Sequence, residues 1–154
     1  MNELRELYQE VIFDHYRKPR NFGQLAHANR EAEGYNPLCG DKIKLYLQVE
    51  NGIIKDASFM GTGCAISTAS ASLMTENLKG KREEDALRLF KNFRSMLTDE
   101  TDAAADTAAQ EKLGKLQALA GVREFPQRVK CATLAWHTLQ AALADKHETV
   151  TTEC

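Results

Sequence analysis

Three cysteines in this sequence lie beside residues that begin or end secondary structure. Cys39 stands in the stretch Asn-Pro-Leu-Cys-Gly-Asp, Cys64 follows Gly-Thr-Gly, and Cys131 comes shortly after Pro126. Glycine lets the backbone approach a crowded site closely. We expect helix N-termini at Cys64 and just before Cys131, and the partial positive charge of such an end stabilises a thiolate. These positions therefore suit reactive or metal-binding thiolates.

A cysteine can also be a small apolar core residue, and any one of the three alone fits that role equally well. The position of all three cysteines at the ends of helices or strands favours a metal-binding or reactive role over a packing role. Their spacings are 25 residues (39 to 64) and 67 residues (64 to 131), which match no short zinc-finger pattern. Cys154 lies in a polar tail and is a poor fourth ligand. Asp41 is a better one, although a residue beside Gly40 can also simply cap a turn.

Three thiolates and one carboxylate suit two kinds of metal centre. One is tetrahedral Zn²⁺ and the other is an iron–sulfur cluster. Four anionic ligands leave a zinc site with an excess negative charge, which nearby cations should offset. Arg128 and Lys130 flank Cys131 and could do so. Cations at a helix start oppose the helix dipole, so their presence there slightly favours a functional role over an ordinary solvated turn.

The elements that must position these residues follow from periodicity. Alternating apolar residues predict strands over 43–49 and 53–59, and Asn51-Gly52 between them is a strong hairpin signal. Helical patterns cover 3–16, 65–78, 83–97, 112–120 and 127–144, with Gly80 and Gly121 as predicted ends of two of them.

Helices around one small antiparallel sheet indicate an α+β fold, and no linker divides the chain. We therefore expect a single domain over 1–154. The acidic segment 98–111 has no apolar anchors and is expected to be a solvated excursion, and 145–154 a flexible tail.

Composition excludes several classes of partner. The 154-residue chain has a formal net charge of -2 and a pI of about 6.1, which favours neither nucleic acid nor an anionic membrane. No apolar run approaches the roughly 20 residues that span a bilayer. The N-terminal residues have helical periodicity instead of a signal-peptide pattern. We therefore expect a cytoplasmic protein with reduced cysteines.

The motifs NPLCGD, GTGCAIS and RVKCATLAWHTL, in this order, resemble those of the U-type iron–sulfur cluster assembly proteins, the IscU/NifU-like family. Within that family the chain is most similar to the SufU branch. Scaffold members have a histidine directly before the third cysteine, where this chain has Lys130. They also carry an LPPVK motif, where this chain reads FPQRVK. The stretch 98–120 resembles the insertion that marks SufU proteins.

The resemblance implies a SufE/NifU-like fold with a three-stranded antiparallel sheet packed against several helices. It implies a zinc site made by Cys39, Asp41, Cys64 and Cys131. It also implies a partner, a PLP-dependent cysteine desulfurase of the SufS type. Cys39 would accept persulfide sulfur from that enzyme and pass it to downstream SUF cluster-assembly proteins. Arg128 would pair with Asp41 or Cys39 and steer the freed thiolate.

Two other functions use the same residues. The chain could be a scaffold that binds a transient iron–sulfur cluster, or iron, at these ligands and transfers it to apo-proteins. It could also be a structural zinc protein that acts through surface contacts alone. Lys130 in place of histidine favours the zinc-dependent sulfurtransferase over the scaffold, and a ligand on an exposed loop argues against a closed structural site.

Overall fold

The computed structural model describes residues 2–37, 40–98, 113–145 and 150–151 of the chain. Its elements in chain order are α1 (Asn2–Arg17), β1 (Arg30–Asn36), β2 (Asp41–Glu50), β3 (Ile53–Thr62), α2 (Ala65–Leu78), α3 (Glu83–Thr98), the 3₁₀ helix η1 (Gly114–Glu124), α6 (Pro126–Leu143) and β4 (Val150–Thr151).

The sheet has the strand order β3-β2-β1-β4. The first three strands pair antiparallel, which confirms the predicted three-stranded sheet, and the two residues of β4 add a parallel edge to β1. The predicted hairpin is confirmed too. Asn51 and Gly52 both have positive φ, 53° and 75°, as a two-residue turn of the favoured twist requires.

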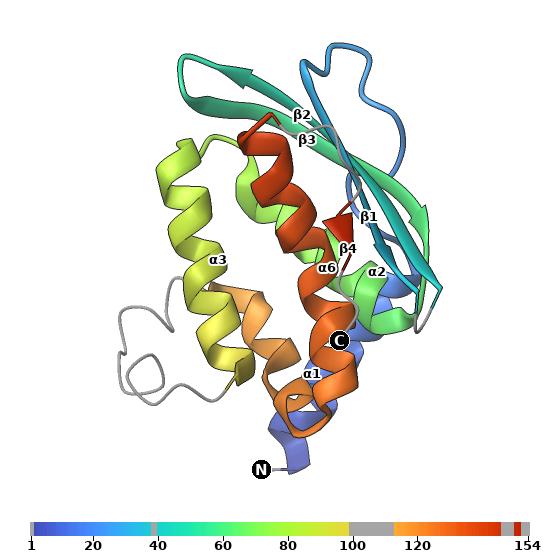
Figure 1. Cartoon of the computed structure of the whole chain (residues 1–154). Coiled ribbons are helices and arrows are strands. Elements are labelled where there is room, and N and C mark those ends of the chain that lie inside the picture. Colours follow the sequence, from blue (N-terminus) through green and yellow to red (C-terminus); the bar gives the residue numbers. More distant parts are fainter. Residues whose placement is uncertain (1, 38–39, 99–112, 146–149, 152–154) are drawn as a thin grey trace.

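The helices lie on one face of this sheet. Helices α2 and α6 lie nearest to it, and α3 runs alongside α6 (Figure 1). Trp136 of α6 is fully buried and stacks on both Phe90 and Phe93 of α3. Strand β1 approaches α6 so closely that a Cβ at Gly34 would overlap the hydroxyl of Thr138. Glycine therefore sets the distance between the sheet and the helix that carries Cys131.

The predicted helix over 65–78 agrees with α2 in both bounds, and the predicted bounds of α1, α3 and α6 differ from the structure by about one residue. The predicted end at Gly121 is wrong, because η1 continues to Glu124. The reason lies in the spacing of its buried residues. A side chain every third position faces the core, as three residues per turn of a 3₁₀ helix require; these are Leu113, Leu116, Leu119 and Val122.

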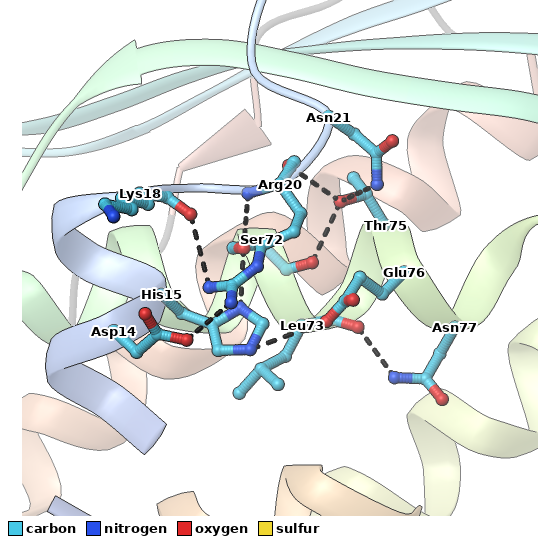
Figure 2. Close-up of polar contacts among 10 residues, drawn as sticks. All are labelled: Asp14, His15, Lys18, Arg20, Asn21, Ser72, Leu73, Thr75, Glu76 and Asn77. Atoms are coloured by element: carbon cyan, nitrogen blue, oxygen red, sulfur yellow. Dashed lines mark hydrogen bonds and ion pairs between the residues drawn. The ribbon is translucent and has the colours of Figure 1, made fainter. Parts of the chain in front are cut away.

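A set of hydrogen-bonded side chains fastens α1 and the following turn to α2 (Figure 2). We call Asp14, His15, Arg20, Ser72 and Glu76 the α1–α2 polar cluster. Nδ1 of His15 lies 2.7 Å from Oγ of Ser72, which also accepts the backbone N–H of Arg20 at 2.8 Å. Nε2 of His15 lies 3.4 Å from Glu76, and Arg20 pairs with Asp14. The cluster satisfies the buried imidazole at both nitrogens.

The turn after α1 also covers the outer edge of the sheet. Asn21 and Gly23 exchange backbone hydrogen bonds with Phe59 of β3, at 2.9 and 2.8 Å. The ring of Phe22 meets that of Phe59 edge to face. In the described sheet β3 is an edge strand, and this turn forms hydrogen bonds with its open edge.

Some predicted features lie outside the described residues: Cys39, nearly all of the acidic segment 98–111, and 146–149 and 152–154 of the predicted tail. Val150 and Thr151 of that tail form β4. Among the helices that the structure describes, none combines the length and apolar character needed to cross a bilayer.

Candidate metal centre

Asp41 is the first residue of β2, and its side chain is fully buried. Its Oδ1 accepts the backbone N–H of Cys64 at 2.9 Å. A Cβ at Gly63 would lie only 2.9 Å from that same oxygen, so the carboxylate packs directly against the Gly63–Cys64 backbone. The absence of a side chain at Gly63 makes this contact possible, and it joins the sheet to the start of α2.

Cys64 is the N-cap of α2, as the sequence predicted. Its Sγ accepts the backbone N–H of Ser67 at 3.4 Å and lies 3.9 Å from Oδ2 of Asp41. A hydrogen bond from Cys131, and then the N–H groups of Ser67 and Ile66, lower the pKa of Cys64 to about 6, although burial and the charge of Asp41 act in the opposite direction. The lowered pKa favours the thiolate of Cys64 more than in an ordinary cysteine.

Cys131 lies in the second turn of α6 and is completely buried. Its Sγ lies 3.9 Å from Nδ2 of Asn36 and 3.8 Å from the carbonyl oxygen of Gln127, one turn earlier. The sequence placed Cys131 near a helix start, but the helix dipole acts mainly within the first turn. The amide of Asn36 and the carbonyl oxygen of Gln127, and not a helix N-terminus, therefore lie next to this sulfur.

A buried cross-link holds the two cysteine-bearing helices together. Ser70 of α2 donates its hydroxyl to the carbonyl oxygen of Ala132 at 2.5 Å and accepts the indole N–H of Trp136 at 3.1 Å. Ala132 directly follows Cys131, so this contact restrains the distance between Cys131 and the helix that begins at Cys64.

Asp41, Cys64 and Cys131 each offer one ligand atom, and these atoms all lie within 4.8 Å of one another. Within the described residues this is the one such group of histidine, cysteine or acidic side chains. Sulfur and oxygen ligands of one tetrahedral zinc ion lie about 3.5–3.8 Å apart, given bond lengths near 2.0–2.3 Å. Two soft sulfurs and a buried carboxylate fit Zn²⁺ with small side-chain adjustments.

Arg128 provides positive charge beside this group. Its side chain is exposed, and the negative charges of Cys64 and then of Cys131 raise the pKa of its guanidinium, as do hydrogen bonds to both sulfurs. The structure thus brings together four of the five predicted site residues: Asp41, Cys64, Cys131 and Arg128. The fifth, Cys39, lies outside the described residues.

Asn36 belongs to this site but was absent from the sequence-based candidates. It ends β1 directly opposite Asp41 in the strand register and is fully buried. Its position before Pro37 in the NPLCGD motif marks a turn, and nothing in the sequence alone aims its amide at Cys131. The proximity of Asn36 to the site can be recognised only when the register of β1 on β2 is known.

The chain is similar to known proteins over most of its length. Residues 7–132 match the family model described as the NifU-like N terminal domain. The chain is 45% identical over 142 residues to the zinc-dependent sulfurtransferase SufU of Bacillus subtilis, with 92% of each chain covered. It is 41% identical over 143 residues to the iron–sulfur cluster assembly scaffold protein IscU of Streptococcus pyogenes, covering 93% of this chain and 86% of that protein.

Solved structures extend the comparison. A putative iron–sulfur cluster assembly scaffold protein for the SUF system from Fervidobacterium islandicum superposes with a TM-score of 0.80 at 36% identity, covering 87% of this chain and 94% of that one. The N-terminal part of a NifU-like protein from Brucella abortus, at 20% identity and a TM-score of 0.76 over 92% and 95% of the two chains, shares the fold. This chain belongs to the NifU-like N-terminal domain family.

Proposed function

We propose that this chain is a zinc-dependent sulfurtransferase of iron–sulfur cluster assembly. It accepts persulfide sulfur from a cysteine desulfurase and relays it to the proteins that build clusters. The observation that carries the proposal is the convergence of two thiols and a buried carboxylate within 4.8 Å, with a guanidinium beside them. The 45% identity to a protein named a zinc-dependent sulfurtransferase supports the same conclusion.

Asp41, Cys64 and Cys131 hold the zinc ion in this proposal, with Cys39 as the fourth ligand. Cys39 is two residues from Asp41, so covalent geometry alone keeps its Cα within about 7 Å of the Asp41 Cα. When bound, zinc keeps the coordinating thiols deprotonated at neutral pH.

Cys39 is the sulfur acceptor. Its thiolate attacks the outer sulfur of the desulfurase persulfide, and a new S–S bond forms on Cys39. The bond between that sulfur and the desulfurase cysteine breaks, and the cysteine leaves as a thiolate. Cys39 then carries the persulfide, with no net oxidation or reduction. The exposed guanidinium of Arg128 would stabilise the negative charge on the sulfurs of this site and orient the thiolate of Cys39.

The partner in this proposal is a PLP-dependent cysteine desulfurase of the SufS type, and the recipients are downstream SUF proteins. Cys64 and Cys131 are anchored in helices and do not exchange with the donor. Asp41, fixed by the N–H of Cys64, keeps the ligand set in place during transfer.

Metal analysis and a sulfur-transfer assay together test the proposal. We expect about one zinc per purified chain and stimulation of a SufS-type desulfurase by the wild-type protein. Cys39→Ala should abolish this stimulation, whereas Cys154→Ala, a change outside the proposed ligand set, should not. Zinc-free protein that still accepts sulfur, or full stimulation by Cys39→Ala, would contradict the proposal.

A cluster scaffold is the second candidate, and the 41% identity to a protein named a scaffold favours it. The same ligands would then hold a transient iron–sulfur cluster. Anaerobic incubation of the zinc protein with ferrous iron, desulfurase and cysteine distinguishes the two functions. Stable iron and sulfide in place of zinc would indicate the scaffold, and retained zinc with a persulfide on the chain would indicate the sulfurtransferase.

A further inference from the structure

Asn36 contacts both the candidate metal centre and the turn that precedes Asp41. Its side-chain Nδ2 faces Sγ of Cys131 at 3.9 Å, inside a fully buried environment. Its backbone carbonyl accepts the N–H of Gly40 at 2.8 Å. Because Asn36 lies opposite Asp41 in the register, it forms the base of the connection that contains Cys39.

A hydrogen bond from an amide to a thiolate has two chemical effects. It fixes the direction of the sulfur lone pairs toward a metal, as groups around metal ligands commonly do. It also withdraws electron density from the sulfur, which lowers its nucleophilicity toward a persulfide. A sulfur held in this way is a good resident ligand and a poor acceptor.

Both sulfurs that the structure describes in this centre receive a hydrogen bond from Arg128, and each also faces a further N–H donor, which differs between the two. Cys64 receives the backbone N–H of Ser67 at the start of α2, at 3.4 Å. Cys131 lies deeper in its helix and faces the amide of Asn36, which comes from the sheet. The side-chain amide of Asn36 therefore donates to Cys131, whereas a backbone N–H at the helix N-terminus donates to Cys64.

We propose that Asn36 is a positioning residue that hydrogen-bonds the sulfur of Cys131, keeps it in the metal shell and thereby confines sulfur acceptance to Cys39. This inference rests on the proposed function, because it concerns which of the zinc ligands accepts the sulfur. Without the Asn36 amide, Cys131 becomes able to undergo the same exchange. The transferred sulfur then bonds to Cys131, and the desulfurase cysteine leaves as a thiolate.

Two variants of Asn36 and one matched control test this role. Asn36→Ala removes the amide, and Asn36→Asp keeps the size but replaces the N–H donor with a carboxylate. The control, Asn29→Ala, removes two hydrogen bonds to the backbone of Val49, at 2.7 and 2.8 Å, near the other end of β2. This control variant loses a similar number of contacts to the sheet as the Asn36 variants, and it leaves the metal centre unchanged.

We expect zinc release to a chelator to be roughly 10–100-fold faster in both Asn36 variants than in wild type, and unchanged in Asn29→Ala. The absorption bands of the cobalt-substituted protein, which report the sulfur ligands, should shift only in the Asn36 variants. After reaction with desulfurase and cysteine, mass spectrometry should locate persulfide on Cys39 in wild type and on both Cys39 and Cys131 in Asn36→Ala.

A measurement on the wild-type chain tests the hydrogen bond without any variant. In cadmium-loaded protein, nuclear magnetic resonance should detect coupling between the Asn36 side-chain amide proton and the cadmium nucleus, transmitted through the sulfur. Absence of that coupling, or equal zinc release and equal persulfide sites in Asn36→Ala and Asn29→Ala, overturns the inference. Wild-type protein that binds no zinc or accepts no sulfur overturns the proposed function instead.

Discussion

Helix α2 carries two groups of polar side chains that differ in how their charges are balanced. In the α1–α2 polar cluster, Arg20 pairs with Asp14, and His15 lies between a hydroxyl and a carboxylate (Figure 2). In the candidate metal centre, at the N-terminus of the same helix, a buried carboxylate lies beside two thiols. There the hydrogen bond from Cys131 is the largest of the effects that lower the pKa of Cys64 to about 6, and the charge of Asp41 opposes that shift.

This difference separates a structural cluster from a binding site. In the first group, the contacts with Ser72 and Glu76 compensate the cost of burying His15. Arg20 and Asp14 pair with each other at a more exposed position. Acidic groups gathered within 4.8 Å repel one another once they ionise, and the neighbouring cation, Arg128, is exposed to solvent. A bound divalent cation would relieve that repulsion, so we expect the two groups to respond differently to metal, mutation and pH.

The largest expected effect is that of metal removal. If zinc is present at about a thousand times its dissociation constant, its loss costs about 4 kcal/mol of the free energy of unfolding. For a chain of this size the melting temperature should fall by about 8–16 °C. Calorimetry before and after chelation measures this, and restoration by added zinc is the control. An unchanged melting curve would mean that the folded chain does not use these ligands.

Ser72→Ala should damage the other group without affecting metal. It leaves Nδ1 of His15 and the backbone N–H of Arg20 without the oxygen they share, at a cost of about 2–4 kcal/mol. Urea denaturation measures the loss. Zinc affinity should stay within about twofold of wild type, because Ser72 lies two turns along α2 from Cys64. A large loss of zinc affinity would show that the two groups are coupled.

Gly63→Ala should affect the metal centre with little change elsewhere. The added methyl group would lie 2.9 Å from Oδ1 of Asp41 and push the carboxylate away from its position. We expect zinc affinity to fall roughly tenfold or more, measured by competition with a chromophoric chelator. Gly121→Ala is the matched control, because a Cβ there meets no atom within 4 Å. Equal affinity in both variants would contradict the assignment of Asp41 as a ligand.

The smallest effect concerns pH and His15. Burial and the charge of Arg20 lower the pKa of His15, and the charges of Glu76 and Asp14 only partly oppose this, while Lys115 lowers it further. Stability from this group is thus complete above the unfolded pKa of about 6.5 and is lost as pH falls through the folded pKa.

To isolate His15, both wild type and His15→Gln should be unfolded in urea without metal, at about pH 7.5 and about pH 5.5. Wild type should lose more of its free energy of unfolding than the variant, because glutamine does not titrate. Equal losses would indicate that the imidazole gains its proton without penalty and that the cluster is more open than the structure indicates.

Local signals predicted much of this fold. The Asn51-Gly52 turn and the bounds of α2 follow from residues adjacent in sequence. Two of the three motif cysteines, Cys64 and Cys131, lie in the group that the structure brings together. The helix over 112–120 was predicted as well, but its end at Gly121 was wrong, because a glycine does not stop the three-residue period of η1. Asn36 was missed for a different reason. Its role depends on strand register and on a sulfur 95 residues away, which no local pattern encodes.

The proposed ligands that the structure describes come from β2, the cap of α2 and the second turn of α6, and this order has a consequence for synthesis of the chain. At roughly 5–20 residues per second, the ribosome takes on the order of 3–13 s to advance from Cys64 to Cys131. During that interval the growing polypeptide holds an incomplete chelate. If this set binds zinc, as proposed, the metal can be fully coordinated only after α6 has been translated. Bound zinc would then show that the polypeptide has folded as far as that helix.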